Sequence, residues 1–177
     1  MKWNLPNILT MGRILIIPAF MWAFTQNTIL AMAFFLIAAI TDFLDGYLAR
    51  KNQQVTVFGQ FLDPIADKLL VFSALLLFVS VGQTPVWVAM LVIARELLVT
   101  GLRILAIDKK IIIPAGISGK VKTTVQIIAV LWMLSPLAYT PIAGGVTTND
   151  VAVYAILFVT LWSGIDYFYK FRKIFAD

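Results

Sequence analysis

The sequence predicts an all-α integral membrane protein with six transmembrane helices, formed as a single domain over residues 1–177. Hydrophobic residues make up 61% of the chain and charged residues only 13%, which leaves too little polar side chain to cover a water-facing surface. Six apolar segments approach the roughly 20 residues that cross a bilayer as a helix. Helix is the expected form, because backbone groups in hydrocarbon must pair within their own segment.

The first three expected spans carry polar residues that bear on function. The first, Ile8–Phe24, is interrupted by Arg13, so we expect no cleaved secretory signal, and Pro18 is expected to kink the helix. The second and third, Ile29–Arg50 and Gly59–Val81, are joined by a short connector. We therefore expect these two helices to be antiparallel neighbours.

The last three expected spans are Pro85–Ile107, Val121–Leu137 and Val151–Phe168. The fourth holds two arginines and a glutamate, and each charge inside a span is costly enough to need a reason.

The connectors predict the orientation of the chain. Those after the first, third and fifth spans, Thr25–Thr28, Gly82–Thr84 and Ser135–Asp150, contain no Lys or Arg. Basic residues gather instead at the opposite ends of the spans: Lys2, Arg50, Lys51, Lys109, Lys110, Lys120, Lys170, Arg172 and Lys173. This bias predicts that both termini lie in the cytoplasm, in a multi-pass protein of the cell's inner (cytoplasmic) membrane. The net charge of +5 is spread in this way, which favours anionic lipid headgroups and excludes nucleic acid as the expected partner.

Four aspartates are clustered on the second and third spans, towards the cytoplasmic side: Asp42, Asp45, Asp63 and Asp67. The spacings of three and four residues place each pair on one helical face. Four ionised carboxylates would repel one another, so either some are protonated or cations lie among them. The chain has no Cys and no His, so the ligands must be oxygen atoms, which suits one or two Mg²⁺ or Mn²⁺ ions. Two such ions would neutralise a pyrophosphate and stabilise an in-line phosphoryl displacement.

Residues around the aspartates favour a phosphate ligand. Gly46 and Ala49 leave little side chain on this stretch, so a ligand could approach the backbone, and Arg50 offers several donors to a phosphate. Gly59 opens the third span, where unpaired N–H groups favour an anion.

These residues resemble a known signature. The stretch Asp42–Arg50, followed by Gly59, Asp63 and Asp67, is similar to the CDP-alcohol phosphotransferase pattern D-x-x-D-G-x-x-A-R…G-x-x-x-D-x-x-x-D at every fixed position. Three further stretches resemble the bacterial phosphatidylglycerophosphate synthase branch: Asn4–Thr10, Ala94–Arg103 and Gly119–Thr123. That branch joins CDP-diacylglycerol to glycerol 3-phosphate and releases CMP. The resemblance implies the helical bundle of that family, a homodimer, and an active site that faces the cytoplasm.

The resemblance also implies roles for single residues. Asp42, Asp45 and Asp63 would bind metal, and Asp67 would complete the second metal site and act as the general base towards the attacking hydroxyl. The residues assigned to the CDP part are Gly46, Ala49, Arg50, Thr56 and Gly59, with Asn7 nearby from the first span.

Other cations are expected to hold the acceptor. Arg95 and Arg103 are eight residues apart on the fourth span and therefore lie roughly on one face. Arg13 lies in the cytoplasmic half of the first span, and Lys120 and Lys122 open the fifth. Together they could form a basic pocket for an anionic acceptor such as glycerol 3-phosphate.

Within the same reaction class the acceptor stays open to inositol phosphate, serine or phosphatidylglycerol. Inositol or serine would not require so many cations, although inositol phosphate would. Structural readings also stay open. Glu96 could form an ion pair with Arg103 or Lys68, and Lys120 and Lys122 could be interfacial anchors.

An ion-coupled transporter is the alternative from a different class, because intramembrane carboxylates can mark an ion path. It predicts polar residues that continue to the outer side of the membrane. The outer halves of the second and third spans, Ile29–Ile40 and Leu69–Val81, are nearly all apolar, which favours a site open to one side.

Overall fold

The computed structural model describes residues 5–52, 57–108 and 116–172. Within these ranges, the side chains of residues 5–9, 43, 45–52, 57–64, 67 and 107–108 lie outside the description. The described ranges contain six α-helices, as the sequence predicts: α1 Leu5–Gln26, α2 Thr28–Asn52, α3 Val57–Ser80, α4 Val86–Asp108, α5 Ile117–Leu134 and α6 Thr148–Phe171.

Most helices extend a few residues beyond the apolar runs, because a helix ends at a cap and not where hydrophobicity ends. Asn27 is the single residue between α1 and α2. Its backbone N–H donates to the carbonyl of Ala23 at 2.8 Å, and its side-chain Oδ1 accepts from the N–H of Ile29 at 2.7 Å. One asparagine therefore ends the first helix and caps the second.

The segment after α5 differs from the prediction. The expected fifth span continued to Leu137, but α5 ends at Leu134, because a residue that precedes proline is disfavoured in helical geometry and Pro136 follows Ser135. The connector then forms a 3₁₀ helix, η1 Pro136–Tyr139, and a small hairpin of β1 Pro141–Ala143 and β2 Val146–Thr147. Gly144 and Gly145 form its turn with positive φ angles of 60° and 83°.

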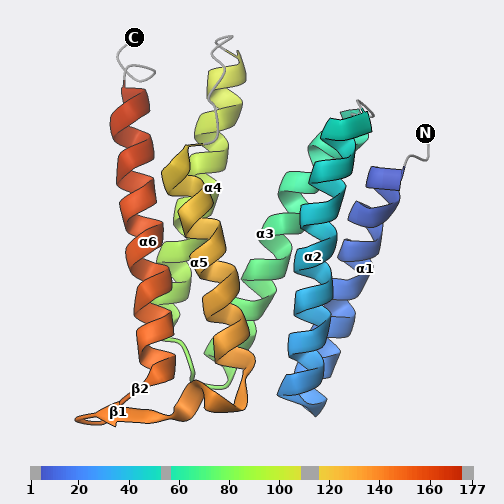
Figure 1. Ribbon diagram of the computed structural model, residues 1–177. Helices are drawn as coiled ribbons and strands as arrows, with labels where there is room; N and C mark the ends of the chain where they lie inside the picture. The colour runs from blue at the N-terminus through green and yellow to red at the C-terminus, as the bar shows by residue number, and fades with distance from the viewer. Residues whose placement is uncertain (1–4, 53–56, 109–115, 173–177) are drawn as a thin grey trace.

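The helices form a bundle in which α1 begins and α6 ends at the same end (Figure 1). Helix α1 packs against both α2 and α3, while α6 packs against both α4 and α5. The predicted neighbours α2 and α3 contact each other much less than each contacts α1. Fully buried Ala23, Ala31 and Ala38 allow this close approach of α1 and α2, as small residues do in membrane bundles.

The interior is apolar and aromatic in the half of the bundle where α1 ends and α2 begins. Phe20 packs on Phe35 with ring centroids 5.7 Å apart, and Phe24 packs edge-on against Phe78 at 5.9 Å. These rings join α1, α2 and α3 in one hydrophobic core, which also includes buried residues of α4, α5 and α6.

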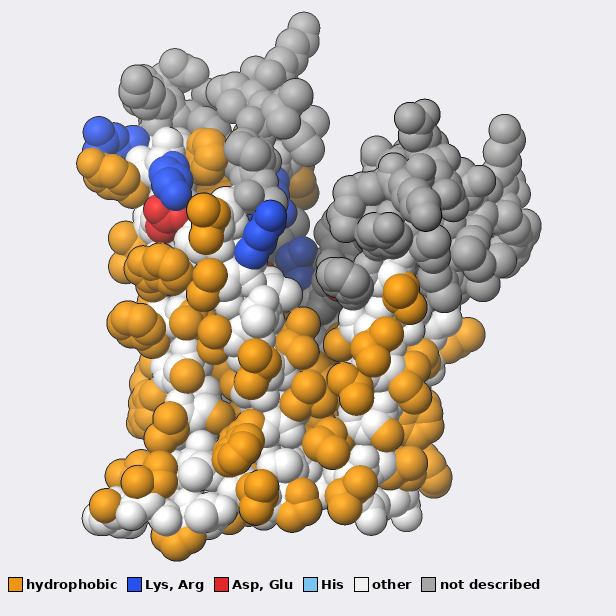
Figure 2. All heavy atoms as spheres, viewed as in Figure 1, with side chains coloured by type: hydrophobic (Ala, Val, Ile, Leu, Met, Phe, Trp, Pro, Cys, Tyr) orange, Lys and Arg blue, Asp and Glu red, His pale blue; other side chains and the backbone are white. Residues whose placement is uncertain are grey.

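The outside of the bundle is apolar as well. Leu15, Phe158 and Ile165 are 74%, 70% and 70% exposed, which would be unfavourable in water but suits a lipid environment. On the face drawn in Figure 2, hydrophobic side chains cover the lower part and the Lys and Arg side chains lie towards the end where α6 finishes. Among the described residues, α5 and α6 are long and apolar enough to cross a membrane, and α2 and α3 hold shorter apolar stretches, Thr28–Asp42 and Lys68–Ser80. The chain is an all-α membrane protein.

Candidate functional site

A cavity of about 790 Å³ lies among the helices, and all six contribute to its lining. We call it the polar cavity, after its charged lining residues: Arg13 of α1, Asp42 of α2, Lys68 of α3, Arg95, Glu96 and Arg103 of α4, Lys120 and Lys122 of α5, and Asp166 and Lys170 of α6. Seven of these described side chains are basic and three are acidic, so the lining carries a net charge of +4. A cavity with this excess attracts an anionic ligand.

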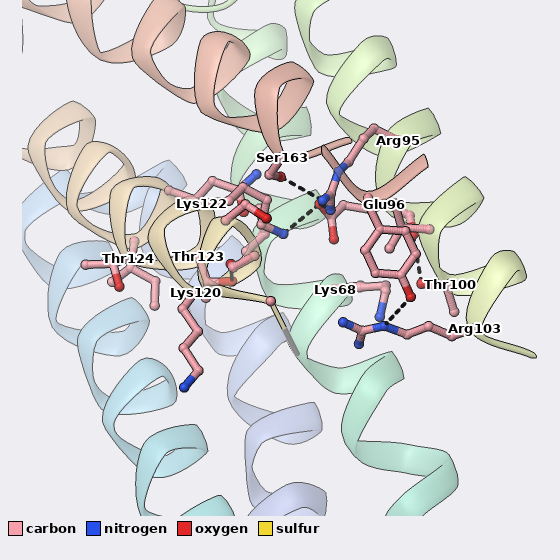
Figure 3. Close-up of a pocket in the computed structure, with 18 of the residues that line it drawn as sticks. Lys68, Arg95, Glu96, Thr100, Arg103, Lys120, Lys122, Thr123, Thr124 and Ser163 are labelled. Atoms are coloured by element: carbon pink, nitrogen blue, oxygen red, sulfur yellow. Dashed lines mark hydrogen bonds and ion pairs between the residues drawn. The ribbon is translucent and has the colours of Figure 1, made fainter. Parts of the chain in front are cut away.

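A buried ion cluster forms one wall of the polar cavity (Figure 3). The Oε1 atom of Glu96 accepts from Arg95 Nη1 at 2.8 Å and from Lys122 Nζ at 2.6 Å. The three side chains are only 9 to 12% exposed. Since two cations share one carboxylate, the cluster keeps a net charge of +1.

The partners of Glu96 differ from those considered from the sequence. Among the described residues its ion pairs are with Arg95 and Lys122, and not with Arg103 or Lys68. Lys122 is also buried, so it is not an interfacial anchor, whereas Lys120 is exposed and extends away from the cluster in Figure 3. Helix α5 therefore presents one lysine to the interior and another to the opening.

Helix α6 holds the other side of Arg95. The Nη2 atom of Arg95 donates to the hydroxyl of Ser163 at 2.7 Å, and that hydroxyl in turn donates to the carbonyl of Thr160 at 3.4 Å. Gly164 lies beside the stem of Arg95, where a Cβ atom would be 3.1 Å from Arg95 Cγ. The Nε atom of Arg95 is buried and has no hydrogen-bond partner among the described residues.

Two further polar contacts join α6 to its neighbours. Ser118, near the start of α5, donates to Asp166 at 2.5 Å, and Lys170 reaches the same carboxylate at 2.8 Å. Arg103 donates to the hydroxyl of Tyr167 at 3.2 Å and lies 5.7 Å from the centre of its ring. Helix α6 is therefore joined by side-chain hydrogen bonds to both α5 and α4.

The α6 residues were not predicted from the sequence. Ser163, Gly164, Asp166 and Tyr167 lie in the expected span Val151–Phe168, in which no site residue was predicted. Asp166 was a usable signal, because an acidic residue inside a span is costly and needs a partner. Nothing in the sequence indicated that Ser163 faces Arg95.

Arg13 and Asp42 form a contact between α1 and α2 on the other side of the cavity. Arg13 Nη1 lies 2.5 Å from Asp42 Oδ1, and the Arg13 side chain is fully buried while that of Asp42 is 40% exposed. The sequence grouped Arg13 with the acceptor-binding cations, but Arg13 forms an ion pair with Asp42, the first of the predicted metal ligands. An acceptor role for Arg13 stays a prediction.

The remaining predicted site residues lie outside the described side chains: Asn7, Asp45, Gly46, Ala49, Arg50, Thr56, Gly59, Asp63 and Asp67. The backbone of α2 is helical through Asp42 and Asp45, and that of α3 through Asp63 and Asp67. The three- and four-residue spacings therefore place each pair on one helical face.

Four carboxylates are a suitable donor set for Mg²⁺ or Mn²⁺, since both ions prefer oxygen ligands. Asp42 is the member whose side chain is described, and it opens onto the polar cavity. No group of three or more acidic side chains that could hold a metal occurs among the side chains that the structure describes. The fit to a metal rests on donor chemistry and helical spacing.

The chain is similar to known proteins over nearly its whole length. The family model for CDP-alcohol phosphatidyltransferase matches residues 3–162. A Bacillus subtilis (strain 168) protein named CDP-diacylglycerol–glycerol-3-phosphate 3-phosphatidyltransferase is 39% identical over 189 aligned positions, covering 95% of each chain. An Escherichia coli (strain K12) protein of the same name is 37% identical over 188 positions, covering all of both. A Mycobacterium tuberculosis (strain H37Rv) protein named probable phosphatidylglycerophosphate synthase is 41% identical over 173 positions, covering 93% of this chain and 79% of its own.

Proposed function

Because the chain belongs to the CDP-alcohol phosphatidyltransferase family, we propose that it transfers a phosphatidyl group from CDP-diacylglycerol to glycerol 3-phosphate. The products are phosphatidylglycerol phosphate and CMP. The observation that carries the choice of acceptor is the net charge of +4 in the lining of the polar cavity, together with the names of the full-length relatives.

The reaction is a displacement at phosphorus. The acceptor hydroxyl forms a bond to the phosphorus that bears diacylglycerol, the bond from that phosphorus to the bridging oxygen breaks, and CMP leaves with the electron pair. Asp67 takes the proton of the hydroxyl. In this reaction class most of the catalysis comes from holding the two substrates in line and from stabilising the charge that develops.

The donor is proposed to bind between α2 and α3. Asp42, Asp45, Asp63 and Asp67 would hold two Mg²⁺ or Mn²⁺ ions, which supply charge neutralisation for the pyrophosphate. The CDP part would be held by Gly46, Ala49, Arg50, Thr56, Gly59 and Asn7. Arg13 is proposed to fix the orientation of the Asp42 carboxylate. The ion pair between the two side chains supports this proposal.

The acceptor is proposed to bind on the α4–α5 side of the polar cavity. Arg95 and Lys122 are held together by Glu96, and the net charge of +1 of this cluster attracts the phosphate. Arg103 and Lys120 would complete the pocket nearer its opening, where both side chains are exposed. A phosphorylated acceptor can be recognised by this set, whereas a neutral alcohol would leave its charges unpaired.

The position of the enzyme in the membrane is also a proposal. We infer six crossings of the cell's inner (cytoplasmic) membrane, with both termini and the polar cavity on the cytoplasmic side, from the distribution of Lys and Arg in the sequence. We also propose that the protein forms a homodimer, as its resemblance to the family implies.

The proposed reaction is tested with an acceptor panel. Purified protein in lipid vesicles receives CDP-diacylglycerol and, in separate reactions, glycerol 3-phosphate, glycerol, inositol phosphate, serine and phosphatidylglycerol. We expect CMP release with glycerol 3-phosphate, at a rate at least about tenfold above glycerol and serine, which lack the phosphate, since each lost charged hydrogen bond is on the order of 1.5–3 kcal/mol. CMP release with inositol phosphate and not with glycerol 3-phosphate would contradict the proposal, and release with none would contradict the reaction class.

A further inference from the structure

We propose that Ser163 and Gly164 of α6 form a seat for Arg95, and that this seat sets how tightly the enzyme holds the phosphate of its acceptor. The inference rests on the proposed function, in which Arg95 contacts that phosphate. It adds two positioning residues on a helix that carries none of the predicted substrate contacts.

Gly164 supplies the space in which the stem of Arg95 lies. A Cβ atom at this position would be 3.1 Å from Arg95 Cγ and 3.5 Å from Arg95 Nε. The first distance is shorter than ordinary van der Waals contact, so any side chain at residue 164 would push the arginine away. The backbone of α6 and the stem of Arg95 are therefore packed as closely as the absence of a side chain allows.

Ser163 sets the direction of the guanidinium group. Ser163 is 1% exposed, and its hydroxyl accepts from Arg95 Nη2 at 2.7 Å and donates to the carbonyl of Thr160. The other terminal nitrogen, Nη1, is held by Glu96. Because the guanidinium is planar, contacts at both terminal nitrogens leave it a single orientation.

The seat is itself held in the bundle by a buried contact. Thr160, one turn before Ser163 on α6, is fully buried, and its hydroxyl accepts from Gln126 of α5 at 3.1 Å. Gln126 lies one helical turn after Lys122 on the same helix. The contact between α5 and α6 therefore fixes the position of Ser163, which binds Arg95, relative to Lys122.

Arg95 also lines the polar cavity, where the proposed function places the phosphate of the acceptor. Its Nε atom is buried against α6, 3.5 Å from where a Cβ atom of residue 164 would lie, and has no hydrogen-bond partner among the described residues. Moving Arg95 by a few tenths of an ångström changes its contact with the phosphate of the acceptor. The donor substrate is assigned to other residues, none of them on α4 or α6, so its binding should not change.

The test compares the kinetics of three variants with those of one control. In Ser163→Ala we expect KM for glycerol 3-phosphate to rise about tenfold or more, since a hydrogen bond to a charged group has an effect of that order. A similar rise is expected in Gly164→Ala, because the added Cβ atom would displace the stem of Arg95. KM for CDP-diacylglycerol should stay within about twofold. Arg95→Gln should raise KM for glycerol 3-phosphate at least as much. Gly101→Ala is the matched control, because it makes the same change on α4 where an added Cβ meets no atom within 4 Å.

The outcomes separate the seat from the proposed function. If Arg95→Gln leaves KM for glycerol 3-phosphate unchanged, the assignment of the acceptor site is wrong. If Arg95→Gln raises it but neither α6 variant does, the seat alone is wrong. Equal rises in both KM values for the α6 variants would mean general damage to the fold and would also overturn the seat. Should Gly164→Ala fail to fold, Ser163→Ala decides the matter, because it removes one oxygen atom and adds no bulk.

Discussion

Glu96 illustrates how a single side chain makes a charged cluster tolerable inside a helix bundle. An isolated buried charge is strongly unfavourable, and two neighbouring cations are more so. By accepting from both Arg95 and Lys122 through one oxygen, Glu96 offsets that repulsion and still leaves an excess of positive charge. The cluster that Glu96 makes tolerable therefore still attracts an anion, although Glu96 itself lowers its net charge.

In the proposed reaction, Asp67 is the residue that takes the proton of the attacking hydroxyl. We expect Asp67→Asn to lower the rate of CMP release by roughly 10²- to 10⁴-fold, because an amide cannot take the proton of the attacking hydroxyl. The protein should stay folded in detergent, with an unchanged elution volume and melting temperature.

The matched control for Asp67→Asn is Asp150→Asn. Asp150 lies in the first turn of α6, where it takes part in a capping box with Thr147, far along the chain from the predicted site. This control should keep full activity. Near-normal turnover in Asp67→Asn would remove Asp67 from the role of base.

At the scale of whole helices, the arrangement of α1, α2 and α3 decides where the aspartates lie. Each of α2 and α3 carries one pair of carboxylates on one face, and α1 packs against both helices. The ion pair from Arg13 to Asp42 fixes α1 to the first of these pairs. Helix α1 would therefore support the proposed donor site through Arg13, a residue that the sequence grouped with the acceptor-binding cations.

Two helices that each present a pair of carboxylates predict metal dependence. EDTA should abolish CMP release, and Mg²⁺ or Mn²⁺ should restore it, since cations must offset the repulsion among four acidic groups. Asp45→Asn should raise the metal concentration needed for half-maximal activity by at least about tenfold, since even residues that only support a ligand have effects of that size.

EDTA that has been saturated with Mg²⁺ beforehand is the control for the chelator itself, and it should leave activity intact. Full activity in excess EDTA would refute the metal site. Unchanged metal requirement in Asp45→Asn would exclude that residue as a ligand.

At the scale of the whole molecule, the bundle has two chemically different ends. The described basic residues near the start of α5, Lys120 and Lys122, and at the end of α6, Lys170 and the C-cap residue Arg172, lie towards the end of the bundle where α1 begins and α6 finishes (Figures 1 and 2). The other end holds Asn27, η1 and the hairpin, and the apolar surface lies between. This polarity favours one orientation in the membrane over the other.

The orientation can be measured by cysteine labelling, because the natural chain contains no cysteine. With a maleimide that cannot cross the cytoplasmic membrane, we expect Asn27→Cys and Val146→Cys to be labelled on cells whose cytoplasmic membrane is intact and accessible from outside. Lys170→Cys should be labelled only after the membrane is permeabilised. The unmodified protein is the control and should never be labelled. The reverse pattern would place the polar cavity on the outer side and would contradict the proposed topology.

The sequence by itself determined the helical class, the number of helices and the family. In hydrocarbon, apolar runs without an alternating pattern can satisfy their backbone groups only as helices. The family could be recognised because the spacing of Asp42, Gly46, Asp63 and their neighbours is a property of the sequence and needs no knowledge of how the helices pack. Asp166 could also have been found, as an acid within an apolar run. The tertiary structure alone decided that Arg95 meets Ser163 and that Lys122 meets Glu96, pairs separated by 68 and 26 residues. Helical periodicity tells which residues share a face, but the rotation of each helix and the identity of its neighbour depend on the packing of the whole bundle.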